Sequence, residues 1–334
     1  LILSWLRDCE VGHTSTCNPN TDQRYKSYVD IILIDVLELR LVRARSDWKY
    51  LALSYVWGGV AILQAMIENI ATLERQSSLL GLQEKIPKTI RDAMEMTKAL
   101  KERYLWCNVL YIIQDDAEQK YDQIAHMDVI YRHASLTIAA LSSINANSGL
   151  PGISREFTGP ERCLGGTENM LLIPQPLNLD AIDPLPYERR AWTLQERIFS
   201  KRRIYFTEQN IFLSCSRGVS AENDAGRVVR FRDSWEPLNK SEAIEGLAAY
   251  VRIVNTYTRR DLSYQSDILN AFHGLGIPME NFRTRFTNGL PENPFDFSLL
   301  WAPERILHRR SGSSESEEFF PSWSWAGWIG PVTY

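Results

Sequence analysis

The sequence has no excess of positive charge, because 37 Lys and Arg residues stand against 41 Asp and Glu residues. Nucleic-acid-binding proteins usually carry a basic surplus, so we expect no nucleic-acid partner. No apolar run approaches the roughly 18 residues that a membrane span needs, and the opening LILSWLRDCE is charged too early for a signal peptide. The five cysteines are odd in number and scattered, which argues against a disulfide framework and favours a reducing, cytoplasmic compartment.

Glycine-rich phosphate-binding patterns are missing as well. Neither G-x-G-x-x-G nor a Walker sequence occurs, so we expect no nucleotide cofactor held by such a loop. What the chain has in quantity is apolar and aromatic surface, since 44% of its 334 residues are hydrophobic and ten are tryptophan. This composition predicts a globular protein, long enough for two domains or for one core with a large appendage.

Apolar segments and amphipathic helices alternate in the first half of the chain. Strands are predicted at 31–36, 51–56, 104–113 and 136–141, with helices at 87–100 and 124–131. The segment 104–113, YLWCNVLYII, is the most apolar of all and is predicted as a central strand covered on both faces. The alternation predicts right-handed crossovers and therefore an α/β fold with a doubly wound, mostly parallel sheet.

Polar side chains gather where two of these strands end. In open α/β sheets, ligands bind outside the carboxyl ends of the strands, so residues at these ends are candidates for a binding site. The candidates are Ser54, Tyr55, Trp57, Gly58, Gln114 and Asp115. Asn108 joins them as the polar residue within the central strand. The alternatives are a tight strand exit at Gly58 and a buried amide bonded to backbone at Asn108.

A second cluster lies in RAWTLQER, residues 190–197. If this segment is helical, Trp192 and Glu196 fall on adjacent sides of one turn, with arginines around the carboxylate. A structural ion pair is the alternative, because ion-pair networks perturb carboxylates as active sites do. A β-hairpin is predicted next, from 203–206 and 211–215.

The composition shifts past residue 216. We predict an N-terminal helix and loop (1–30), an α/β domain (31–215) and a mainly helical appendage (216–334) whose Trp-rich end packs on the core. Smaller elements are a strand at 171–174 and loops at 142–166 and 311–318.

The N-terminal helix presents three residues whose side chains can bind metals. Cys9, His13 and Cys17 are spaced four apart, so they share one helix face. A closed structural zinc site needs four ligands, and the sequence near this helix supplies no fourth. The expectation is therefore two thiols used in packing and no metal site.

Several blocks of the sequence, in the same order, resemble the heterokaryon-incompatibility (HET) domain family of filamentous fungi. The blocks are ALSYVWGG, IPKTIRDAMEMTKALKERYLWCNVLYIIQDD, MDVIYRHASLTIAAL, GLPGI, RAWTLQERIFSKRRIYF and PSWSWAGW. The resemblance runs through roughly residues 48–215, and the last block is similar to a segment that often follows that domain. Several blocks in order are far more specific than one short motif.

The resemblance implies a flavodoxin-like α/β fold of the kind found in Toll/interleukin-receptor (TIR) domains, several of which cleave NAD. In catalytic TIR domains a helix carries Trp-x-x-x-Glu, whose Glu is the essential carboxylate, and Trp192 and Glu196 have that spacing here. The resemblance thus implies a protein of fungal incompatibility and cell-death signalling. It would cleave the nicotinamide–ribose bond of NAD through Glu196, with NAD as substrate and not as cofactor.

The central segment departs from the family pattern. The family has Asp where this chain has Asn108, and Tyr111 replaces a small Cys. The change removes a charge and any acid–base capacity at that position. It is consistent with a weakened activity, with a site reshaped for another substrate, or with a toxic protein silenced by mutation.

Two other functions therefore stay open beside a nucleotide substrate. One is a non-catalytic signalling module that assembles into homo-oligomers through the HET domain, with Glu196 tied up in an arginine pair. The other is a divergent enzyme of secondary metabolism that acts on an apolar small molecule near Asn108 and Tyr111. The NAD-cleaving interpretation instead expects Glu196 and Trp57 to face one hollow at the rim of the sheet.

Overall fold

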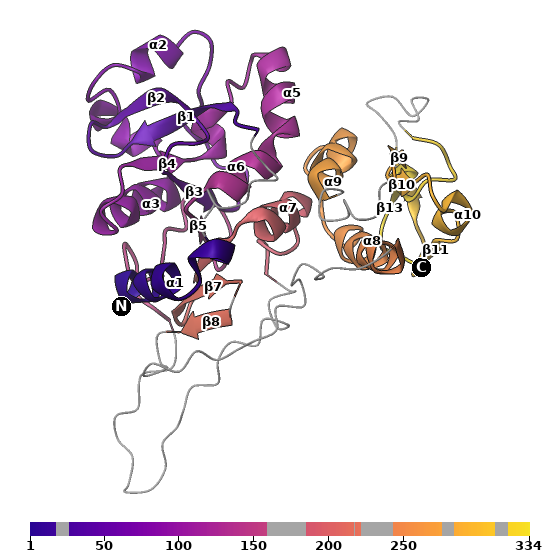
Figure 1. Cartoon of the computed structure of the whole chain (residues 1–334). Helices are drawn as coiled ribbons and strands as arrows, with labels where there is room; N and C mark the ends of the chain where they lie inside the picture. Colours follow the sequence, from indigo (N-terminus) through magenta and orange to yellow (C-terminus); the bar gives the residue numbers. More distant parts are fainter. Residues whose placement is uncertain (18–26, 159–184, 217, 222–242, 276–283, 311–319) are drawn as a thin grey trace, which may run out of the picture. The chain divides into compact units, whose positions relative to one another are not determined.

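The computed structural model describes residues 1–17, 27–158, 185–216, 218–221, 243–275, 284–310 and 320–334 (Figure 1). The chain forms two compact units. Unit 1 comprises Leu1–Tyr187 and Phe199–Asp233, and unit 2 comprises Glu188–Ile198 and Ser234–Tyr334. The predicted strand at 171–174, the loop at 311–318 and part of the loop at 142–166 lie outside the described residues.

Unit 1 is built on one sheet of eight strands. They are β1 (Asp30–Asp35), β2 (Arg40–Arg45), β3 (Leu51–Ser54), β4 (Tyr104–Trp106), β5 (Leu136–Ala139), β6 (Arg202–Phe206), β7 (Ile211–Cys215) and β8 (Gly218–Ala221). Their order across the sheet is β2-β1-β4-β3-β5-β6-β7-β8. The α/β class predicted from the sequence is confirmed, and so is the hairpin of β6 and β7.

The sheet is mixed, so the prediction of a mostly parallel sheet is wrong. Strands β4, β3, β5 and β6 run parallel to their neighbours within this group. The outer strands β1, β2, β7 and β8 pair antiparallel. Short turns join β1 to β2 and β6 through β8, whereas β1 and β4 pair antiparallel across a long stretch of chain. A short turn can only return the chain antiparallel, whereas a parallel neighbour needs a long crossover.

Helices lie between the parallel strands in sequence, and one more, α1, precedes the first strand. Those of unit 1 are α1 (Ile2–Cys17), α2 (Ile70–Leu73), the 3-10 helix η2 (Leu80–Lys85), α3 (Lys88–Ala99), α4 (Asn108–Tyr111), α5 (Ala117–Ala125) and α6 (Met127–His133). Helix α3 begins after Pro87, where the missing N–H of proline costs no helical hydrogen bond. Its apolar side, with Ile90, Ala93 and Met94 buried, packs on β3 and β4.

The predicted central strand is shorter than its apolar run. Strand β4 ends at Trp106, and the run continues as the helical turn α4, in which Leu110 N donates to Cys107 O. Val109 and Leu110 stay fully buried, so the apolar residues still build the core. A short buried strand and a buried helical turn share the same pattern, which explains the error. The predicted helix at 124–131 likewise divides into α5 and α6 at His126.

Unit 2 combines helices with three small two-stranded sheets. Its helices are α7 (Ala191–Phe199, whose last residue belongs to unit 1), α8 (Ala243–Tyr257), η4 (Gln265–Ile268), α9 (Asn270–His273), α10 (Phe295–Ser298) and η6 (Trp325–Gly327). Its strand pairs are β9 (Phe286–Thr287) with β10 (Leu290–Pro291), β11 (Ala302–Pro303) with β14 (Val332–Thr333), and β12 (His308–Arg309) with β13 (Trp328–Ile329). The sequence allowed a helix at 190–197 and predicted a mainly helical appendage, but it did not predict the strand pairs.

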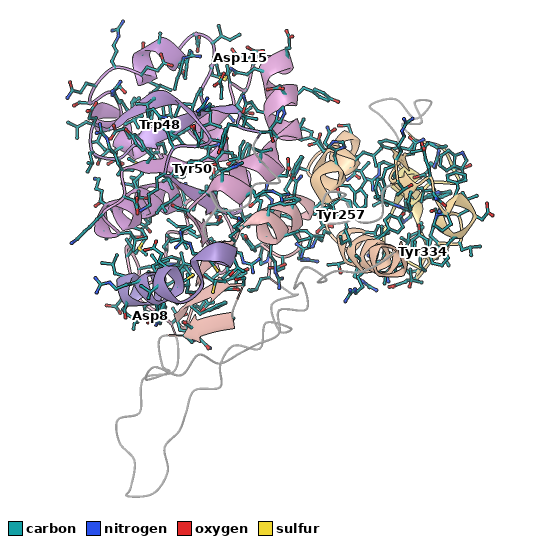
Figure 2. The ribbon with its side chains drawn as sticks, in the orientation of Figure 1. Asp8, Trp48, Tyr50, Asp115, Tyr257 and Tyr334 are labelled. Carbon is teal, nitrogen blue, oxygen red and sulfur yellow. The ribbon has the colours of Figure 1, made fainter. Side chains whose placement is uncertain are left out.

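An aromatic cluster forms the core of unit 2. Trp325 is 1% exposed and its ring meets Phe272 edge-on at 4.9 Å between centroids. The indole N–H of Trp325 donates to the Tyr250 hydroxyl at 3.0 Å, and that hydroxyl lies 2.8 Å from the hydroxyl of Tyr334. Figure 2 labels Tyr334 and another ring of this cluster, Tyr257. Trp325 of the Trp-rich end is therefore buried in unit 2, whereas Trp323 of the same segment is 40% exposed. Among the described residues, no helix has the length and apolar character of a membrane span.

Candidate functional site

The strand order reverses its direction at β3. From β3 the chain passes to β4 on one side and then to β5 on the other, so the crossovers leave β3 toward opposite edges. In open α/β sheets this reversal opens a crevice at the carboxyl ends of the two strands beside it. The segment Ser54–Gly58 leaves the sheet at this place, and the loop after β5 begins there.

The first two residues of this segment face the core. The Ser54 hydroxyl shares a hydrogen bond with the hydroxyl of Tyr187, and both residues are buried. Tyr55 is 2% exposed, and its hydroxyl accepts a hydrogen bond from the Cys107 thiol, with 3.7 Å between sulfur and oxygen. Burial raises the pKa of Cys107 to about 12, so this thiol stays protonated near neutral pH and is no nucleophile. Ser54 and Tyr55 thus support the rim from inside.

Trp57 and Asn108 form the exposed part of the rim. The indole Nε1 of Trp57 donates a hydrogen bond to the Asn108 side-chain oxygen at 3.1 Å, and both side chains are half-buried. Asn108 is the first residue of α4, two residues past Trp106, where β4 ends. Parallel pairing of β3 with β4 therefore brings two residues together that are 51 positions apart in sequence. The sequence also allowed an Asn108 amide that is buried and bonded to backbone. In the structure its side-chain oxygen bonds to the Trp57 side chain instead.

Gly58 lets the loop after β5 approach the rim. Its φ is +67°, and a Cβ at this position would lie 2.2 Å from the Cβ of Asn145. Beside it, the carbonyl of Trp57 accepts a hydrogen bond from Ala146 N at 3.1 Å. Only glycine combines this backbone conformation with such a close contact. The Ser/Asn/Gly composition of residues 142–149 signalled a loop here but not its contact with Gly58.

Two further residues hold this loop in place, and sequence reasoning missed both. Asp92 on α3 is 5% exposed and accepts hydrogen bonds from Leu150 N, at 2.6 Å, and from the Ser154 hydroxyl. Arg155 donates to Ser142 at 2.8 Å and to Glu208, just past β6. The hydrogen bond from Arg155 lowers the pKa of Glu208 below its usual value. No local pattern announces such anchors, since their partners are distant in sequence.

Gln114 and Asp115 form hydrogen bonds with nearby backbone groups. Gln114 N donates to Ala65 O at 2.9 Å, and its side-chain amide donates to Ile112 O. The exposed Asp115 (Figure 2) accepts a hydrogen bond from Ile67 N at 2.9 Å. Both residues thus fasten the segment 65–67. In the described part of the chain, neither Gln114 nor Asp115 is hydrogen-bonded to Trp57 or Asn108.

Trp192 and Glu196 occupy one face of α7, because positions four apart in a helix lie one above the other. Glu196 is 4% exposed and Trp192 is half-buried. These residues belong to unit 2, whereas Trp57 belongs to unit 1. The expectation that Glu196 and Trp57 face one hollow stays a prediction.

A buried ion-pair network includes Glu188, which precedes α7 in the sequence, and Arg197, which lies on α7. The Glu188 carboxylate accepts hydrogen bonds from Arg260, at 2.6 Å, and from Arg197, at 3.4 Å. The Arg260 guanidinium also donates to Arg190 O and to the Thr193 hydroxyl. The arginine predicted beside Glu196, Arg197, is thus bound to Glu188. This network joins the start of α7 to the segment after α8.

Two of the three residues of α1 that can bind metals, Cys9 and Cys17, lie close together in the structure. The sulfur atoms of Cys9 and Cys17 lie close together, and they are joined by Cys215 at the end of β7. The side chain of His13 lies outside the described residues. Sequence spacing alone could not reveal Cys215, which comes from a distant strand.

Comparison with known proteins identifies one part of the chain. The family model described as heterokaryon incompatibility protein (HET) matches residues 50–196. No curated protein and no solved structure matches the chain. The matched span begins just before β3 and ends at Glu196, so it contains the rim residues and the Trp192–Glu196 pair. Residues 50–196 of the chain therefore match the heterokaryon-incompatibility (HET) family.

Proposed function

We propose that this heterokaryon-incompatibility-type protein acts in fungal cell-death signalling by hydrolysing the bond between nicotinamide and ribose in NAD, with Glu196 as its essential carboxylate. The observation that carries the proposal is the reversal of strand order at β3, with Trp57 and Asn108 at its carboxyl edge. Counted from β3, the parallel strands follow the order 2-1-3-4, as in flavodoxin-like sheets, which bind nucleotides at such a reversal. The TIR-like character suggested by the sequence belongs to this proposal.

The chemistry needs little acid catalysis. The C–N bond breaks with its electron pair moving to the nicotinamide nitrogen, which neutralises the positive charge of the ring. The ribosyl cation left behind takes the oxygen of water, and one proton is released with ADP-ribose. A carboxylate such as Glu196 stabilises that cation or binds the ribose hydroxyls, as the carboxylates of glycosidases do.

The rim residues have distinct parts in this proposal. Trp57, half-buried, offers an indole face for stacking on a ring of the ligand, whereas Tyr55 is buried and supports the rim from inside. The Asn108 amide offers a donor to the ligand while its oxygen accepts from Trp57. Gly58 keeps the loop close.

Nicotinamide release from NAD by the purified full chain tests the proposal. We expect release by the wild-type protein and a loss on the order of a thousandfold in Glu196→Gln, which keeps the side-chain size and removes the charge. Glu118→Gln, an exposed acid at the start of α5, is the matched control and should keep full activity. Release that is equal in Glu196→Gln and the wild type would exclude Glu196 from the chemistry.

One observation favours a second candidate, an enzyme acting on an apolar small molecule. Asn108 stands where the family has Asp, and its side-chain oxygen is already engaged by Trp57. A neutral pair at the rim suits an uncharged ligand better than a carboxylate would. Wild-type protein that releases no nicotinamide, while Asn108→Asp gains the activity, would support a reshaped site. If both proteins are inactive and light scattering shows self-assembly, the non-catalytic signalling module becomes the better account.

A further inference from the structure

Three thiols from two distant segments of unit 1 meet between α1 and β7. The sulfur atoms of Cys9, Cys17 and Cys215 all lie within 4.8 Å of one another. Cys9 and Cys17 are 3% and 1% exposed, and Cys215 is half-buried. Eight residues of straight helix span about 12 Å, so the two α1 sulfurs can meet only where the helix bends between them. The NAD-cleavage proposal uses none of the three.

Polar contacts on both sides hold this cluster in place. The Ser216 hydroxyl lies 2.9 Å from the Cys17 sulfur and donates to the Thr16 hydroxyl at 3.0 Å. Across the hairpin, Arg202 pairs with Cys215 in the strand register and donates to Glu10, the residue after Cys9, at 3.1 Å. Helix α1 is therefore docked on β6 and β7 around the thiols.

The spacing of the sulfurs fits a soft metal ion. Zinc–thiolate bonds of about 2.3 Å in a tetrahedron place the sulfurs about 3.8 Å apart, so the cluster would contract by roughly 1 Å at most. Thiolate ligands select Zn²⁺ or Cu(I) and disfavour Mg²⁺ and Ca²⁺, which take oxygen ligands. Packing alone would explain one or two buried thiols, but it does not require three to converge.

We propose that Cys9, Cys17 and Cys215 form a structural Zn²⁺ site that fastens helix α1 to the sheet of unit 1. Binding breaks three S–H bonds, releases the protons to solvent and forms three Zn–S bonds, with a further ligand completing the tetrahedron. The ion would link residues about 200 positions apart and so stabilise the docking of α1. The site is independent of NAD cleavage.

Cobalt substitution of the reduced full chain tests the site, because Co²⁺ replaces Zn²⁺ and its thiolate bonds absorb in the near ultraviolet. We expect one Co²⁺ per chain with thiolate charge-transfer absorption, displaced by Zn²⁺ and unaffected by Mg²⁺. Cys9→Ser and Cys215→Ser should each weaken binding by about 100-fold or more. Cys215→His should retain binding with weaker charge-transfer absorption, since an imidazole replaces one thiolate.

Cys107→Ala is the matched control. This cysteine is also buried in unit 1, but its thiol bonds to Tyr55 and lies outside the cluster, so binding should be unchanged. A wild-type chain without thiolate absorption would overturn the proposal. So would thiolate absorption in Cys9→Ser and Cys215→Ser that equals the absorption of the wild type. A protein mass two hydrogens lower, mapping to a disulfide within the cluster, would also overturn it.

Discussion

Two tryptophans show how differently the two units use the same side chain. Trp325 in unit 2 is 1% exposed, and its indole N–H donates to a Tyr250 hydroxyl that is itself buried. Trp57 in unit 1 is half-buried, and its N–H donates to the Asn108 amide at the end of two strands. Both indoles have a hydrogen-bond partner, but only Trp325 is enclosed by other rings.

The difference separates a stabilising role from a recognition role. An enclosed tryptophan contributes through buried area and ring contacts, which are worth several kcal/mol in a core. A half-buried tryptophan at a strand end contributes less to folding and keeps a face for a ligand. The comparison therefore predicts that mutations at Trp325 act on stability and that mutations around Trp57 act on the site.

Replacing Trp325 should have the largest effect. Trp325→Ala removes a buried indole and its hydrogen bond to the Tyr250 hydroxyl, which should cost about 3–5 kcal/mol in the unfolding of unit 2. Denaturant unfolding followed by circular dichroism measures the loss. Trp57→Ala is the matched variant and should cost no more than about 1–2 kcal/mol. Equal losses in the two variants would abolish the distinction between the two regions.

The sequence made parts of this comparison predictable. Trp325 lies in PSWSWAGW, too aromatic for a solvated tail, so its burial could be expected, although its partners Tyr250 and Phe272 could not. Trp57 was placed at the rim because the strand before it ends there. Its hydrogen bond to Asn108 depends on the parallel pairing of β3 with β4. The sequence predicted a strand that extends to residue 113, although β4 ends at Trp106, so Asn108 was placed inside a strand and the contact was not predicted.

The candidate site divides in the same way. Residues next to a strand end, such as Ser54 and Trp57, follow from local pattern and the general rule for α/β sheets. Asp92 and Arg155, which fix the loop after β5, bond to partners dozens of residues away, and no period in the sequence encodes that. Cys215 joins Cys9 and Cys17 only through the docking of α1 on β7. Side-chain contacts between residues far apart in the chain could therefore not be predicted from the sequence.

Replacing Gly58 should cause the next largest loss of stability, and it tests whether the loop after β5 packs tightly against Gly58. Gly58→Ala adds a methyl group at φ +67° that would meet the Cβ of Asn145 at 2.2 Å, so we expect a loss of about 2–3 kcal/mol. Gly59→Ala is a close control, because Gly59 has the same φ of +67° and no atom within 4 Å of the added Cβ. It should cost about 1 kcal/mol from backbone strain alone. Thermal unfolding of the two variants gives the difference, and the absence of one would mean that the loop does not press on Gly58.

The bond between Trp57 and Asn108 should contribute a smaller amount. Trp57→Phe and Asn108→Ala each remove one partner, and the double variant completes a cycle that isolates their coupling. We expect about 0.5–1.5 kcal/mol, the usual net value of one hydrogen bond, from denaturant unfolding. Additive losses would mean that the two side chains act independently, and Asn108 would then be free to bind a ligand through its oxygen.

The smallest expected effect is on the stability of unit 1 at acid pH. Unit 1 contains Asp35, a carboxyl group whose pKa is lowered. Burial by itself would raise the pKa of Asp35, but hydrogen bonds from Arg103 and from the backbone of Glu38 and Leu37 outweigh it and lower the pKa below its usual value. The folded state therefore binds fewer protons than the unfolded state. The stabilisation is complete above about pH 4 and is lost as the pH falls through the lowered pKa.

Asp35→Asn tests this pH dependence. The variant should be less stable at neutral pH, and its stability should fall less steeply between about pH 4 and pH 2 than that of the wild type. Hydrogen exchange of peptides from β1 and β2 follows unit 1, and peptides from α8 report unit 2, where no change is expected. Because the Arg103 side chain is 42% exposed, solvent screening should keep the difference small. Acid curves of equal steepness in the two proteins would show that Asp35 titrates alike in both states, so its bonds with Arg103 would not stabilise unit 1.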